Sequence, residues 1–177
     1  MMINITVSID ERVMMLPPDY LENKVVPSTG TGPGALLQDG EWCGHAESEY
    51  DVFDVQAGNE NIFSLQLPDL DDEHDSDELT APVVMVHSAA GIAFPVYDTR
   101  KHPASLFYAE EGQSEFEPSP LQPAFHCPNC DHQQFHLSVG FELPNDSQSP
   151  NDTSWFALAA KCVACGWAEI IYDDETA

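Results

Sequence analysis

The residues of this sequence that point most directly to chemistry are four cysteines near its C-terminal end. They form two pairs with C-x2-C spacing, Cys127 with Cys130 and Cys162 with Cys165. Four thiolates at such spacing complete the tetrahedral coordination that a structural zinc ion prefers. We therefore predict that these cysteines bind one structural zinc ion, in a closed site with no position for a catalytic water. Two disulfides or four free thiols are the alternative interpretations of the same residues.

The segments around the two cysteine pairs have the pattern of β-strands. Apolar residues alternate with polar ones over 135–143, an apolar run covers 155–160, and a third strand pattern covers 167–172. The 31 residues between the pairs exceed the usual spacing of about 15–20, because residues 144–154 form a polar loop of turn-forming residues. Two metal-binding turns on a three-stranded antiparallel sheet resemble the zinc ribbon, over roughly the last 50 residues of the chain.

The resemblance to zinc ribbons implies a fold motif that metal holds together. It does not imply a particular function, since zinc ribbons occur in transcription, translation, nucleases and protein adaptors. Turn-forming residues are expected beside the cysteines: Gly166 follows the second pair, whereas Asp131 stands where a glycine would be more usual. Three histidines flank the first pair, but with four cysteines available we expect none of them to bind the metal. They are His126, His132 and His136.

The chain as a whole is strongly acidic. Its 177 residues include 31 aspartates and glutamates against 5 lysines and arginines, a formal net charge of −26 at pH 7. No lysine or arginine lies between Lys24 and Arg100. Nucleic-acid binding draws its affinity from basic side chains that neutralise phosphates, so we expect no direct binding of DNA or RNA. Such a charge instead favours a basic protein partner.

Acidic residues between Glu41 and Glu60 are interleaved with apolar and aromatic ones, a pattern typical of a folded acidic surface. Carboxylates there would steer a basic partner, and aromatic side chains would provide the close contacts. The acidic run Asp69–Glu78 either belongs to this surface or is an ordinary solvated loop. The candidate contact residues are Glu41, Trp42, Glu47, Glu49, Tyr50, Asp51, Phe53, Asp54, Asp71, Asp72 and Glu73.

Composition and periodicity predict a β-rich fold, either all-β or α+β. Outside the cysteine-rich segment, strand patterns lie at residues 3–9, 13–16, 51–57, 62–67, 82–87, 92–97 and 105–109. The Gly58-Asn59 turn predicts that two of these strands, 51–57 and 62–67, pair as a hairpin. The chain divides into an acidic β-rich domain, a proline-rich linker and a zinc-ribbon domain. These segments cover residues 1–111, 112–124 and 125–177 respectively.

A search of the sequence for catalytic groups finds weak candidates. Cys43 and His45 place a thiol near an imidazole, but neighbours on one strand do not form a catalytic pair, and His87 and His102 have no specific context. The sequence has neither a signal-peptide pattern nor an apolar run of about 18 residues. We therefore expect a cytoplasmic, non-enzymatic protein without membrane contact.

The function expected from these features is that of an inhibitor or immunity-type protein. Its acidic surface would neutralise a basic protein partner, such as a nuclease or another toxin, by standing in for the phosphates that the partner binds. The alternative is a zinc-ribbon adaptor or regulator of transcription or translation that acts through protein–protein contact. Neither the identity of the partner nor the oligomeric state follows from the sequence.

Overall fold

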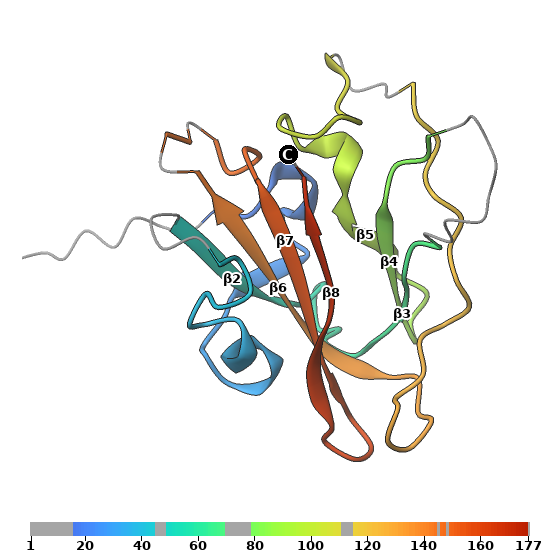
Figure 1. Ribbon diagram of the computed structural model, residues 1–177. Helices are drawn as coiled ribbons and strands as arrows, with labels where there is room; N and C mark the ends of the chain where they lie inside the picture. The colour runs from blue at the N-terminus through green and yellow to red at the C-terminus, as the bar shows by residue number, and fades with distance from the viewer. Residues whose placement is uncertain are drawn as a thin grey trace, which may run out of the picture.

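Figure 1 shows the fold in a computed structural model, which describes residues 16–44, 49–69, 79–110, 115–144, 146–147 and 149–176. The described part of the chain is β-rich, as the sequence predicts. Its strands are β1 (Val25–Pro27), β2 (Glu49–Val55), β3 (Phe63–Gln66), β4 (Val83–Ser88), β5 (Ala93–Asp98), β6 (Phe135–Leu143), β7 (Trp155–Cys162) and β8 (Ala168–Glu175). Short 3-10 helices are η1 (Asp19–Leu21), η2 (Gly32–Leu36) and η3 (Thr99–Lys101). The strand predicted over 3–9 and most of that predicted over 13–16 lie outside the described residues.

β6 is the central strand of one antiparallel sheet. β7 pairs with it from Phe135 to Glu142, and β8 pairs with the far side of β7. The opposite edge of β6 is shared, because β2 pairs with residues 138–143 and β3 pairs with Phe135. From there the sheet continues through β2 to β1, and through β3 and β4 to β5. The three strands predicted around the cysteines are therefore present, as part of a larger sheet.

The main core lies inside the curl of this sheet, where β5 packs over β7. The ring of Tyr97 stacks on that of Phe156, with centroids 4.3 Å apart and planes 3° from parallel. On β6, the alternate side chains of Phe135, Leu137 and Phe141 are buried in the same cluster. Burying each such side chain contributes about 1.5–3 kcal/mol, so the period-two pattern of β6 fixes which of its faces turns inward.

A smaller cluster lies on the other face of β2 and β7. It comprises the buried residues Leu37, Val52, Ala157 and Ala159, with Trp42 and Tyr50 packed against them. Gly140 of β6 permits this packing, because a Cβ atom at that position would lie 2.8 Å from a ring carbon of Trp42. The segment that follows η2 therefore covers the outer face of the sheet.

The predicted hairpin of residues 51–57 and 62–67 is wrong, although both strands exist. β6 lies between β2 and β3, and the Gly58-Asn59 turn closes a single bridge from Ala57 to Glu60. The turn residues indicate a chain reversal, but the long apolar β6 offers each strand a better-buried partner. The strand considered for 105–109 is replaced by turns, in which the N–H of Tyr108 donates to the carbonyl of Ser105 at 3.1 Å.

Hydrogen bonds of the sheet join the segment before the predicted linker, residues 112–124, to the segment after it. β6, from the segment after the linker, pairs with β2 and β3, from the segment before it. Side chains from both segments also meet in the main core, as Tyr97 and Phe156 do. Whether the two segments unfold separately stays a prediction. None of the helices in the described ranges has the length and apolar character that spanning a membrane would need.

Candidate metal centre

Two turns of the same design carry the four cysteines. In the first, Cys127 accepts a hydrogen bond from the N–H of Asp131 at 2.8 Å and donates its own N–H to the His132 carbonyl at 2.7 Å. In the second, Cys162 accepts from Gly166 at 3.0 Å and donates to the Trp167 carbonyl at 2.8 Å. The spacing of donors and acceptors is identical in both turns. Each cysteine pair is therefore held by backbone hydrogen bonds that do not depend on the side chains between them.

The fifth residue of each turn has a left-handed backbone. Gly166 has φ of 77°, and Asp131 has φ of 65° at the equivalent position. Glycine adopts this conformation without steric cost, and aspartate is one of the few other residues that tolerate it. The Asp131 carboxylate also pairs with Nδ1 of His126 at 2.7 Å. The aspartate that replaces the more usual glycine is thus compatible with the turn.

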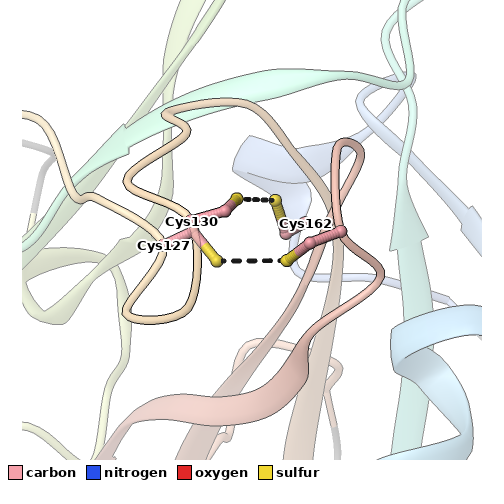
Figure 2. A group of neighbouring side chains, drawn as sticks. Cys127, Cys130 and Cys162 are labelled. Carbon is pink, nitrogen blue, oxygen red and sulfur yellow. Dashed lines mark hydrogen bonds between the residues drawn. The ribbon is translucent and has the colours of Figure 1, made fainter.

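The four sulfur atoms converge at the end of β6 and β7 nearest the cysteine turns. Figure 2 shows the pairs facing one another, with 3.6 Å between Sγ of Cys127 and Sγ of Cys165 and the same distance between Cys130 and Cys162. All four ligand atoms lie within 4.8 Å of one another. Sulfurs bound at 2.3 Å to one tetrahedral ion lie about 3.8 Å apart, so the cluster has the size that a metal ion requires. None of the five cysteines is in a disulfide.

The two cysteines of each pair have different environments. Cys127 and Cys162 are buried, whereas Cys130 and Cys165 are exposed. Hydrogen bonds from the Asn129 side chain and then from the Trp167 backbone lower the pKa of the Cys165 thiol to about 6. At Cys130 the backbone of His132 favours the thiolate, but desolvation and the hydrogen bonds with the other thiols outweigh it and raise the pKa to about 12. Thiols this close compete for the charge, and all four can ionise together when a cation lies between them.

The side chains of two of the three nearby histidines have partners outside the cluster of sulfurs. His126 contacts Asp131 through Nδ1 and the Gln133 amide through Nε2 at 2.9 Å. His136 donates Nδ1–H to the Asn61 carbonyl at 3.0 Å, and the carbonyl of His132 accepts the hydrogen bond from Cys127. The group of side chains that could hold a metal comprises the four cysteines.

The aromatic residues proposed as partner contacts pack within the chain. Trp42 donates Nε1–H to the Leu37 carbonyl at 2.9 Å, and the Tyr50 hydroxyl donates to the Gln38 carbonyl. Both rings are half-buried, with centroids 5.9 Å apart. Phe53 is 1% exposed in the main core, so the interpretation of this ring as a surface contact is wrong, because alternation along β2 turns it inward.

The acidic contact candidates are spread over several environments. Glu41 is exposed, Asp51 is half-buried on β2, and Asp54 accepts a hydrogen bond from Ser138 Oγ at 2.7 Å. The described residues do not include Glu47, Asp71, Asp72 or Glu73, nor the side chain of Glu49. Of the described candidates, Glu41 has the open carboxylate that a partner contact needs.

A buried histidine and tyrosine form a pair that sequence reasoning missed. The Tyr20 hydroxyl donates to Nε2 of His102 at 2.9 Å, and Nδ1–H of His102 donates to the Asn151 carbonyl at 3.3 Å. His102 is 0% exposed, and burial lowers its pKa to about 4, so the imidazole is neutral. The three residues lie far apart in the sequence, and no local pattern links them. The pair joins η1 to the residue that follows η3.

Of the cysteine and histidine considered for catalysis, the structure describes the cysteine. Cys43 is buried, and its thiol donates to the Gly40 carbonyl at 3.0 Å, while His45 lies outside the described residues.

Comparisons with protein families, with curated proteins and with solved structures found no match to this chain. The metal centre therefore rests on its own geometry, which consists of two equivalent turns and four converging sulfurs.

Proposed function

We propose that the four cysteines bind one zinc ion and that this ion is structural. An all-sulfur donor set of this size suits zinc, and four protein ligands leave no open position for water or substrate. When bound, zinc supplies a cross-link between the two turns. The chain supplies the rest, because the backbone hydrogen bonds at Cys127 and Cys162 aim the sulfurs at a common point.

We further propose that the protein is a non-enzymatic, acidic binding protein that neutralises a basic protein partner, such as a nuclease or another toxin. The observation that carries this proposal is that two of the few basic side chains, Arg100 and Lys24, make contacts within the fold. Arg100 is bound to the buried carboxylate of Asp98 through Nε and Nη2, each at 2.9 Å. Lys24 donates to the Tyr20 carbonyl at 3.1 Å and lies over the ring of Phe94. Both of these cations contact groups within the fold, and 5 basic residues cannot balance 31 acidic ones.

A surface of this charge acts on a basic partner at two ranges. At long range its field raises the association rate, and this effect weakens with salt. At contact, carboxylates replace the phosphates that a nuclease or a similar toxin recognises, so binding would occupy the partner's substrate site. The same charge disfavours nucleic acid as a ligand, because only 5 basic residues are present to neutralise phosphates.

The experiment that tests this function is isolation of the partner followed by reconstitution. The chain is immobilised, partners are captured from its native host, and each captured protein is purified alone. We expect a partner of high isoelectric point whose enzymatic activity falls as the acidic protein is added up to equimolar amounts, with an association rate that drops between low and high salt. A neutral or acidic partner with salt-independent binding would contradict the proposal and favour the adaptor function.

A further inference from the structure

The outer edge of β8 is the longest unprotected strand edge in the described sheet. Within the residues that the structure describes, β8 pairs with β7 and with no other strand (Figure 1). The other two ends of the sheet are blunted. β5 carries Pro95 in its middle, and β1 is short and ends at Pro27. Proline cannot donate to a neighbouring strand, whereas β8 spans Ala168–Glu175 with neither proline nor glycine, and its pairing with β7 is interrupted by one register shift between Leu158 and Ala159.

This edge is anionic, and none of its acidic residues has a basic register partner on β7. Glu169, Asp173 and Glu175 are exposed. Their register partners on β7 are Ala160, Ala157 and Trp155, so no basic residue lies opposite them. Lys161, the basic residue of β7, lies opposite Ala168 at the end of the strand. Three exposed carboxylates therefore lie on an eight-residue strand whose outer edge pairs with no other described strand.

β8 is fixed at both ends, which prepares its edge for pairing. The second cysteine turn holds its start, since Cys162 donates to the Trp167 carbonyl immediately before the strand. Near its other end, the Tyr97 hydroxyl donates to the Asp174 carboxylate at 2.9 Å. Between them, the ring of Tyr172 lies 6.2 Å from Tyr97. A strand held in this way loses little conformational entropy when a second strand binds, so more of the contact energy appears as affinity.

We propose that the outer edge of β8 is the docking site for an extended, lysine- or arginine-bearing segment of the basic partner, which adds a strand to the sheet. Backbone hydrogen bonds would give affinity, and basic side chains on one face of the added strand would pair with Asp173 and Glu175 and give specificity, while Glu169 lies on the other face, opposite Ala160. Ile170, 39% exposed on the same strand, offers an apolar contact. A second copy of this chain is disfavoured, since antiparallel pairing would bring Glu169 of one copy close to the acids at the end of the other strand.

The proposal rests on the proposed function and is tested with a defined probe. The probe is a peptide of about eight residues that alternates lysine and valine, which matches the length of β8. Its control has the same side chains but N-methylated alternate amides, and so the same charge without the strand hydrogen bonds. We expect the probe to bind at physiological salt and to slow hydrogen exchange of β8 amides. The control peptide should bind at least about tenfold more weakly.

Two protein variants separate the strand edge from the general acidity. Glu169→Lys with Asp173→Lys should weaken binding of the probe at least about tenfold. Glu22→Lys with Glu115→Lys changes the net charge equally at exposed positions outside β8, and should weaken it much less. Equal binding of probe and control peptide, protection of amides elsewhere, or equal effects of the two variants would overturn the proposal. So would concentration-dependent dimerisation that the β8 variant abolishes.

Failure of this inference is distinguishable from failure of the proposed function. If the isolated basic partner binds the Glu169→Lys, Asp173→Lys variant as tightly as the wild type, docking at β8 is wrong while the proposed function stands. If no basic protein binds the wild type, the proposed function is wrong whatever the peptide does.

Discussion

Acidification is expected to weaken the fold through His102, because this imidazole is buried and neutral. Burial lowers its pKa from 6.5 to about 4, against smaller opposing effects of the Asn151 carbonyl and the Asp98 carboxylate. Above pH 6.5 the imidazole is neutral in both the folded and the unfolded chain. As the pH falls towards 4, the unfolded chain binds a proton that the folded chain excludes, so the free energy of unfolding decreases. The difference between the two pKa values corresponds to about 3 kcal/mol.

The measurement is urea denaturation of the wild type and of His102→Gln at several pH values between about 4 and 7. The stability advantage of the wild type should shrink by about 3 kcal/mol over that range. Protonation of the cysteines and carboxylates also changes stability with pH. Desolvation, for example, raises the pKa of Asp174, which acts in the opposite direction. These groups are present in both proteins, so their effects cancel in the difference.

His87→Gln, at a half-buried position on β4, is the control for removing an imidazole. For each variant, we compare how much the stability advantage of the wild type shrinks between about pH 7 and pH 4. The effect of His102 is the shrinkage measured with His102→Gln minus the shrinkage measured with His87→Gln. Wild type and His102→Gln curves that stay parallel between about pH 4 and pH 7 would refute the reasoning. They would mean that the imidazole of His102 titrates alike in the folded and unfolded chains, and hence that its surroundings are accessible to water.

Three further predictions concern the metal and the charge. Protein purified without added metal should contain one zinc ion per chain by elemental analysis; a metal-free protein with an intact β6–β8 sheet would contradict this. Cys127→Ser should lose the metal. Because β2, β3 and β7 all pair with β6, hydrogen exchange should become faster in all three strands. Protection retained in β2 to β5 would instead show that the two parts of the chain fold separately. The protein should not bind DNA or RNA at about 0.15 M salt, and micromolar binding in a titration there would refute the electrostatic argument.

The sequence predicts the region of the metal centre well because its signals are local. Alternation over 135–143 fixes the inward face of β6, and the C-x2-C spacing matches a turn in which both sulfurs point the same way. Asp131 stands where the sequence pattern favours glycine, and the structure shows that this aspartate adopts the left-handed backbone of the turn. Patterns that span a few residues determine these features, so distant parts of the chain do not change them.

The features that the sequence misses depend on distant segments. The Gly58-Asn59 turn predicts a hairpin, but residues about 80 positions later supply β6, which separates the two strands. Phe53 resembles a surface aromatic within its acidic segment, yet its neighbour in the core is Phe141, whose ring lies 6.4 Å away. His102 and Tyr20 likewise meet through the fold. Strand order and partner choice are set by total burial, which no local window contains.

The position of the four cysteines explains how so acidic a chain keeps its fold. Crowded carboxylates repel one another and oppose compaction, and only 5 basic residues are available to offset 31 acids. Zinc binding in isolated fingers is worth about 10–16 kcal/mol, comparable with the whole stability of an ordinary domain. Zinc bound as proposed would supply that energy at one end of β6, the strand on which β2, β3 and β7 all pair. The second cysteine turn, Cys162 to Trp167, holds the start of β8. Metal would therefore stabilise both the sheet and the edge proposed to bind a partner, so chelation should abolish partner binding together with folding.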